Sequence, residues 1–176
     1  MLSRIMTGGL IGRLIGRVIG VAGAAMTMLI APIAWADNGP PNPIAGNASL
    51  PNVNVYPPIS PVDYSVRDGA WYAFGAPGGL TCVIDKTQNG YGCSGPIPAA
   101  PDGANLVSAV GAQEPAFANS AAPLYAVAGP VKQLPPQSRL SYRNVSCAID
   151  AGGATVCVNS SSQHGFVLSP AGSFAA

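Results

Sequence analysis

The chain has 176 residues, only 9% of them charged, and a formal net charge of +1. Its length fits one domain preceded by a processed leader. Three of the eight basic residues lie before residue 37, so the remainder carries five basic and seven acidic side chains. This balance excludes the basic surface that nucleic acid or an anionic membrane would require. The 22 glycines and 18 prolines predict many turns and irregular extended segments.

Residues 1–36 have the pattern of a secretory signal peptide. Three arginines give the segment a positive beginning, and an uncharged apolar run follows at residues 18–31. Pro32 should end the helix of this run, because proline removes a backbone donor and clashes with the preceding turn. Ala34 and Ala36 then supply the small-x-small pattern of a cleavage site.

A retained membrane anchor is the alternative interpretation of this leader. Three glycines recur every four residues from Gly12, a spacing that allows membrane helices to pack closely. The uncharged stretch 18–36 is only marginally long enough to span a bilayer, and it contains Pro32. We therefore expect cleavage after Ala36 and a mature protein without a membrane anchor. It would be secreted or held in the cell envelope, where oxidising conditions allow disulfides.

Residues 37–62 are predicted to be a linker rich in proline and asparagine. Seven prolines fix the backbone and remove donors, so this segment should be extended and polyproline-like. Its first half is expected to be a flexible spacer. Residues 53–56 alternate between apolar and polar side chains, and this pattern predicts an edge strand that lies along the domain.

Residues 63–176 are predicted to form a mainly β domain, either a small antiparallel sheet or a sandwich. Short apolar runs alternate here with glycine and proline turns, and there is no amphipathic helical pattern of useful length. The expected strands are 71–74, 80–85, 105–110, 124–128, 140–142 and 165–168.

One short motif occurs twice. Each copy contains one cysteine and is followed by a second, and these four are all the cysteines of the chain. Thr81–Asp85 ends in the same Ile-Asp pair as Ser146–Asp150, each has a cysteine at its second position, and each is followed by one more cysteine. Each copy predicts a β-hairpin that is closed by its own disulfide. The pairings would be Cys82–Cys93 and Cys147–Cys157, with an exchange between the two hairpins as the alternative. Each disulfide would contribute about 3 kcal/mol through the entropy of loop closure.

The spacing of the cysteines argues against other uses. Ten and nine residues separate the members of the two pairs, whereas zinc sites use pairs two to four residues apart. No Cys-x-x-Cys motif indicates a redox-active pair. We therefore expect no metal and no cofactor.

The turns of the two hairpins can also be predicted. Asp85 and Asp150 end the first strands, where an aspartate side chain can cap a turn. If Cys82 lies opposite Cys93, the first loop covers residues 86–89 and Gly90 takes the positive φ. In the second hairpin, residues 151–153 form the turn.

His164 is the only histidine, so it is the only candidate for the base of a serine hydrolase. No Gly-x-Ser-x-Gly motif accompanies it, and the acidic residues are scattered. A surface-loop histidine is the simpler interpretation, and we assign no catalytic residue. Trp71, Tyr72 and Phe74 could line a binding face, although short aromatic strands more often belong to a core.

Several short motifs carry a resemblance to a known group of proteins. Residues 74–82 read Phe-Gly-Ala-Pro-Gly-Gly-Leu-Thr-Cys, and they resemble the Phe-x-x-Pro-x-Gly-x-x-Cys opening of exported proteins from mycobacteria and related actinobacteria. Residues 91–96, 103–107 and 146–169 are similar to the same proteins, and the likeness covers about 64–174. The resemblance implies a secreted small β domain stapled by disulfides, and it supplies no catalytic or binding residue.

Three functions fit these observations, in the following order. The first is an exported, non-enzymatic binding or structural module whose partner is an envelope or extracellular protein or a wall component. The second is a small secreted serine hydrolase that uses His164. The third is a secreted enzyme inhibitor that presents a proline-rich loop such as 94–101.

Overall fold

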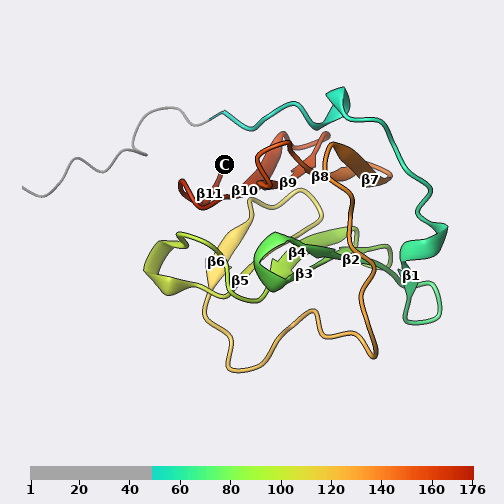
Figure 1. Ribbon diagram of the computed structural model, residues 1–176, viewed down its shortest axis with the longest axis horizontal. Coiled ribbons are helices and arrows are strands. Elements are labelled where there is room, and N and C mark those ends of the chain that lie inside the picture. The colour runs from blue at the N-terminus through green and yellow to red at the C-terminus, as the bar shows by residue number, and fades with distance from the viewer. Residues whose placement is uncertain (1–48) are drawn as a thin grey trace, which may run out of the picture. The chain divides into compact units, whose positions relative to one another are not determined.

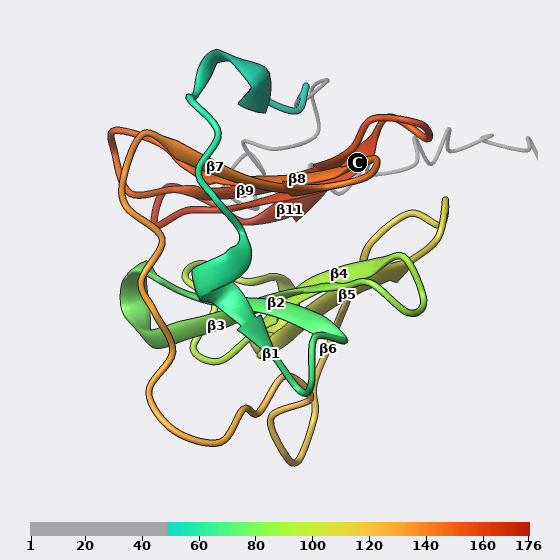
Figure 2. The same cartoon turned by 90° about the vertical axis from the view of Figure 1, so that its right-hand side faces the viewer.

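The computed structural model describes residues 49–176. The predicted signal peptide, its cleavage site at Ala34 and Ala36, and residues 37–48 of the predicted linker lie outside this range. The described part contains two antiparallel sheets and four short 3-10 turns, so the prediction of a mainly β fold is confirmed. Figures 1 and 2 show the two sheets as stacked layers, with β1–β6 in one and β7–β11 in the other. None of the helices within 49–176 is long and apolar enough to cross a membrane.

The N-terminal sheet has six strands, which pair in chain order. They are β1 (Ser65–Val66), β2 (Trp71–Ala76), β3 (Leu80–Asp85), β4 (Gly90–Ser94), β5 (Leu106–Val110) and β6 (Ala116–Ala118). The C-terminal sheet has five strands, which also follow chain order. They are β7 (Ser138–Tyr142), β8 (Val145–Ile149), β9 (Thr155–Asn159), β10 (His164–Leu168) and β11 (Phe174–Ala175). The 3-10 turns are Val53–Val55, Val62–Tyr64, Pro77–Gly79 and Pro101–Gly103.

The main core lies between the two sheets. Side chains alternate along each strand, so Phe74, Cys82 and Ile84 face the same side as Leu140, Cys147 and Phe166 of the other sheet. All six are fully buried in one apolar cluster.

Tyr91 and Phe166 join the two layers of this core. Their rings stack with centroids 5.9 Å apart. The Tyr91 hydroxyl donates a hydrogen bond to the backbone carbonyl of His164, at 3.2 Å. Burial raises the pKa of Tyr91 to about 12, so the hydroxyl keeps its proton at neutral pH. One aromatic residue therefore contributes both packing and a polar link between the sheets.

Both predicted disulfides are present, and the exchange between hairpins is excluded. Cys82 lies directly opposite Cys93 in the β3–β4 ladder, and Cys147 lies opposite Cys157 in the β8–β9 ladder. The Cα–Cα separations of 4.0 and 4.1 Å are near those of the closely spaced, non-hydrogen-bonded pairs of an antiparallel ladder. Two buried disulfides are typical of a domain that folds in an oxidising compartment.

The aspartate caps form as predicted. Asp85 Oδ1 accepts hydrogen bonds from the backbone of Thr87 and Gln88, and Asp150 Oδ1 accepts one from Ala154. The expected positive φ at Gly90 is wrong, because Asn89 adopts it instead, at 51°. Gly90 already belongs to β4 and pairs with strands on both sides, so its backbone must be extended. Asparagine is among the few residues that tolerate the left-handed region.

The predicted edge strand at 53–56 is wrong. The Asn52 side chain accepts a hydrogen bond from the Asn54 amide, and this local contact starts a 3-10 turn at Val53–Val55. Val53 is buried against the outer face of the C-terminal sheet. The late part of the predicted linker thus packs on the domain, but it does not do so as a strand.

The predicted strand at 124–128 is also wrong, since these residues form an irregular loop. Tyr125 of this loop is buried on the outer face of the N-terminal sheet, in a small cluster with Ala73 and Val83. Proline and glycine on both sides prevent a continuous ladder. The strand that pairs with the free edge of β5 is β6 instead.

The segment that leads into each sheet pairs with the first long strand of the other sheet. Before the N-terminal sheet, Ile59 donates to the Arg139 carbonyl at 2.9 Å, and Arg139 donates to the Pro57 carbonyl at 3.0 Å. Before the C-terminal sheet, Gly75 donates to Lys132 at 2.9 Å, and Leu134 donates back to Gly75 at 3.0 Å. The segment before the N-terminal sheet is thus bonded to β7, and the segment before the C-terminal sheet is bonded to β2.

Replacing Cys82 and Cys93 together by alanine should lower the free energy of unfolding by about 3 kcal/mol, because a loop of about a dozen residues is no longer closed in the unfolded chain. Replacing Cys147 and Cys157 should cost a similar amount. Urea unfolding without reductant measures both. Val55→Ser, at a residue that is 69% exposed, is the control and should change stability by less than about 0.5 kcal/mol. A loss no larger than that of this control would contradict the prediction.

Candidate functional site

A row of residues crosses the outer face of the N-terminal sheet, opposite to the face that carries the disulfide. Trp71, Asp85, Gly90 and Val110 lie side by side on β2, β3, β4 and β5. Gly90 has no side chain, so the row is open between Asp85 and Val110. The result is a groove of about 240 Å³, here called the Asp85 groove. Its lining consists of Trp71, Asp85, Gln88, Gly90, Ser108, Ala109, Val110, Leu124 and Tyr125.

One wall of the Asp85 groove is aliphatic and exposed to solvent. Val110 is 46% exposed and Leu124 is 51% exposed. Within residues 49–176, only two other large apolar side chains are as exposed, namely Val55 and Val62, and both belong to the segment before β1. Grouped apolar side chains in a concave surface are typical of binding sites.

The opposite wall is polar and negatively charged. Asp85 Oδ1 accepts hydrogen bonds from the Thr87 amide at 2.8 Å, the Thr87 hydroxyl at 2.6 Å and the Gln88 amide at 3.2 Å. Partial burial alone would raise the pKa of Asp85. The hydrogen bonds from Thr87, from Gln88 and from the Trp71 side chain outweigh burial and hold this pKa below its usual range. The carboxylate is therefore charged at neutral pH.

Trp71 is fixed beside this carboxylate. The Arg67 guanidinium lies 3.7 Å from the centre of the indole ring and also donates to the Ala126 carbonyl at 3.1 Å. The Trp71 and Tyr125 rings form a T-shaped pair, with centroids 5.8 Å apart and planes at 72°. Arg67 thus covers one face of the indole, and the indole N–H donates a hydrogen bond to Asp85.

Tyr125 closes one end of the groove. A Cβ atom at Gly92 would lie 2.6 Å from the Tyr125 hydroxyl, so the ring rests where a side chain of β4 would otherwise be. The Tyr125 amide donates to the Ser94 hydroxyl at 3.4 Å. Burial raises the pKa of Tyr125, and a hydrogen bond with Ser108 only partly offsets this effect. The two outward glycines of β4 are thus used differently: one is covered by Tyr125 and the other is the floor of the groove.

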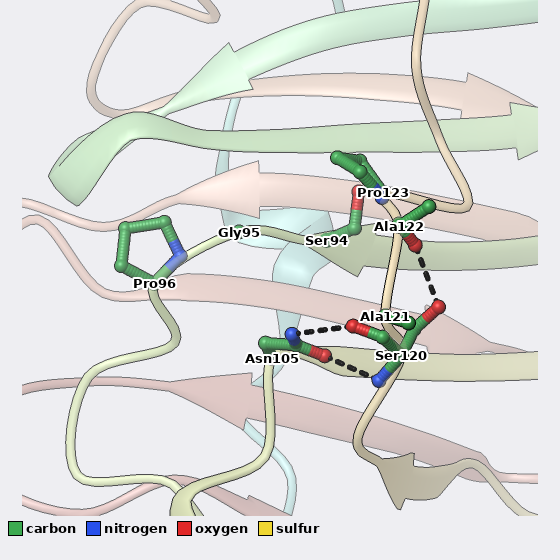
Figure 3. A pocket seen from close by; sticks show the side chains of 8 residues that line it. All are labelled: Ser94, Gly95, Pro96, Asn105, Ser120, Ala121, Ala122 and Pro123. Atoms are coloured by element: carbon green, nitrogen blue, oxygen red, sulfur yellow. Dashed lines mark hydrogen bonds between the residues drawn. The ribbon is translucent and has the colours of Figure 1, made fainter.

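A second cavity, of about 280 Å³, is lined in part by residues 120–123 of the loop that carries Tyr125 (Figure 3). The Asn105 amide group donates to the Ser120 carbonyl at 2.9 Å, and the Ser120 amide donates back to Asn105 Oδ1 at 2.8 Å. The Ser120 hydroxyl donates to the Ala122 carbonyl at 2.6 Å. Figure 3 shows these bonds running between the lining residues. They hold the loop against Asn105, which directly precedes β5. The polar groups that line this cavity therefore bond with one another, which favours a structural role over a ligand site.

His164 is the first residue of β10, and its contacts are structural. Its ring Nδ1 lies 3.2 Å from the Ala112 carbonyl, and its cross-strand neighbour Asn159 donates to the Gly111 carbonyl at 2.7 Å. Both contacts attach the C-terminal sheet to the turn after β5. Among the hydrogen bonds of residues 49–176, none joins the His164 ring to a serine hydroxyl or to a carboxylate. The same part of the chain contains no cluster of three potential metal ligands.

The other residues considered from the sequence lie apart from one another. Phe74 is fully buried, and Tyr72 packs against the inter-sheet core, so Trp71 alone of the aromatic strand reaches the groove. In the proline-rich loop 94–101, Ile97 is inserted into the core. The carbonyl of Ala99 accepts a hydrogen bond from Ser173. Ile97 and the Ala99 carbonyl thus anchor this loop to the rest of the domain.

The sequence contained one signal that could have revealed the groove. In Gly90-Tyr91-Gly92-Cys93, glycine alternates with Tyr91 and Cys93, so the outward face of β4 carries no side chain at two successive positions. Val110 and Leu124 carried no such signal, because their meeting depends on the path of the loop.

Comparisons of the chain with protein families, with curated proteins and with solved structures find no match.

Replacing Asp85 by asparagine keeps a turn-capping oxygen but removes the charge. Because the pKa of Asp85 is lowered in the folded state, its charge stabilises the fold above the unfolded pKa of about 3.9, and this contribution is lost as the pH falls through the folded-state pKa. Asp85→Asn should therefore be less stable than the natural protein at neutral pH, and the difference should disappear in acid. Urea unfolding of both proteins at neutral pH and in acid measures this difference in stability.

Asp68→Asn is the matched control for this measurement, because Asp68 lies in an exposed turn. As an exposed surface substitution, it should change the stability by less than about 0.5 kcal/mol. An Asp85→Asn difference that stays constant from neutral pH to acid would contradict the assignment.

Proposed function

We propose that the mature protein is an exported, non-enzymatic binding module of the cell envelope or the extracellular space. Its binding surface would be the Asp85 groove, and its partner a protein or a wall component outside the cell. The observation that carries this proposal is the exposure of two aliphatic side chains, Val110 and Leu124, in the lining of one concave surface. The leader at residues 1–36 and the two buried disulfides support the location.

The groove stands on a rigid base, which favours binding. Its floor belongs to four consecutive strands of one sheet. The Cys82–Cys93 disulfide joins the two central strands of this base on the opposite face. Because the surface is already ordered, a ligand loses less free energy to the ordering of the protein.

The two alternatives have less support. The ring of His164 contacts a backbone carbonyl, which favours a structural role over that of a catalytic base. The loop 94–101 is anchored through Ile97, which disfavours an inhibitor that inserts this loop into an enzyme.

Placing the photocrosslinking residue p-benzoylphenylalanine at Leu124 should give a discrete heavier adduct when cells that export the protein are irradiated. The same residue at Val62, which is 73% exposed outside the groove, is the matched control and should give no such adduct. Adding Val110→Lys to the Leu124 variant should abolish the adduct, because a charge in the aliphatic wall would have to be desolvated. Gel electrophoresis and mass spectrometry read the result. No adduct at Leu124, or the same adduct at both positions, would refute the groove as the binding surface.

His164→Ala should leave partner binding by the crosslinking assay unchanged, because the side chain does not line the groove. A fluorophosphonate probe, which labels activated serines, should label neither the natural protein nor this variant. Labelling of the natural protein that is lost in His164→Ala would instead support a serine hydrolase.

A further inference from the structure

We propose that the Asp85 groove receives a basic side chain, lysine or arginine, from a partner polypeptide. The aliphatic stem would lie against Val110 and Leu124, and the cation would contact Asp85. This inference rests on the proposed function, since it assumes that the groove is the binding surface.

The width of the groove fits one extended side chain. Asp85 and Val110 lie two strands apart, with Gly90 between them. Adjacent strands are about 4.8 Å apart, so the two walls are separated by about 10 Å between backbones. Tyr125 blocks one end, and Gln88 of the β3–β4 turn borders the groove on the polar side. A single chain of methylene groups can lie in a channel of this width.

The carboxylate of Asp85 retains the capacity to bind a cation. Three hydrogen bonds converge on Oδ1, and the Trp71 indole has only one N–H to give. Each carboxylate oxygen has two acceptor sites, so Oδ2 keeps at least one of them. The only ion pair within residues 49–176 joins Lys132 to Asp63. Asp85 is therefore charged, and no cation of the described residues pairs with it.

The nearby cations are directed elsewhere. The guanidinium of Arg67 lies on the Trp71 ring, and the Lys86 ammonium lies 4.3 Å from the centre of the Tyr72 ring. Tyr72 belongs to the inner face of the sheet, so Lys86 reaches away from the groove.

The two walls together select an amphipathic side chain. Lysine and arginine combine an apolar stem with a charged end, and they commonly lay the stem along apolar surface. A purely apolar ligand would cover Val110 and Leu124 but would desolvate the carboxylate without giving it a partner. A sugar commonly stacks on aromatic faces, but Tyr125 is only 8% exposed and Arg67 covers one face of Trp71, which leaves few aromatic faces for stacking. A basic side chain satisfies both walls.

The test uses NMR titration of the exported protein with two capped pentapeptides that have four alanines around a central lysine or norleucine. Norleucine has the same stem without the ammonium group. The lysine peptide should shift the Trp71 indole N–H and Gly90 amide signals saturably, and it should bind about five-fold more tightly than the norleucine peptide, a ratio typical of a partly exposed ion pair. Added salt should reduce this ratio.

Two variants separate the walls. In Asp85→Asn the two peptides should bind equally, because the cation loses its partner while the turn keeps its cap. Leu124→Ser should weaken both peptides together. If Asp85→Asn fails to fold, Gly90→Ala serves instead. Its added Cβ would lie 3.2 Å from the Ala109 carbonyl oxygen and 3.7 Å from both Asp85 Cβ and Val110 Cγ2, so it should narrow the channel and weaken the binding of both peptides.

Equal binding of the lysine and norleucine peptides to the natural protein would overturn the inference, and so would the absence of any shift at Trp71 and Gly90. Tighter binding of chitotriose at the same signals would also overturn it in favour of a glycan ligand. These results leave the proposed function standing if the Leu124 adduct forms in the crosslinking experiment. Loss of that adduct would refute the proposed function itself.

Discussion

Each disulfide joins cysteines that lie directly opposite each other on neighbouring strands, on the face that is buried between the sheets. This bond fixes the register of β3 against β4 and of β8 against β9. A slip by one residue would turn every side chain of a strand to the other face. Which residues form the core and which face outward is therefore set at Cys82–Cys93 and Cys147–Cys157, and the remaining strands add to these hairpins in chain order.

The two sheets are held together by more than their shared core. Each half of the domain sends the segment before its own sheet across to the first long strand of the other, at Arg139 in β7 and at Gly75 in β2. Figure 2 shows the segment before β1 passing along the C-terminal sheet on its way to the N-terminal sheet. Ile59 and Leu134, which belong to these two segments, also contact the inter-sheet core. The two segments thus add backbone hydrogen bonds and apolar contacts to a thin core, although neither segment is a strand of a sheet.

The candidate site follows from the same register. With Cys93 and Tyr91 facing inward, Gly90 and Gly92 must face outward, and they leave a bare strip along β4. Tyr125 fills the strip over Gly92, while the strip over Gly90 stays open between a charged wall and an aliphatic wall. Asp85 serves two purposes in this arrangement: it caps the turn of the first hairpin, and it supplies the charge of the groove. Structural stabilisation and the proposed binding chemistry therefore share one side chain.

The sequence by itself determined the two hairpins, their disulfides and their aspartate caps, because strand alternation and turn chemistry act between residues close together in the chain. Only the tertiary structure decided how the outer faces are covered. Residues 53–56 alternate in polarity and residues 124–128 form a short apolar run. Both patterns suit a strand, yet the first segment forms a 3-10 turn and the second an irregular loop. Each instead inserts one anchor, Val53 or Tyr125, into surface left open by a sheet. The groove depends on where such a distant loop comes to rest, and no local pattern encodes that position.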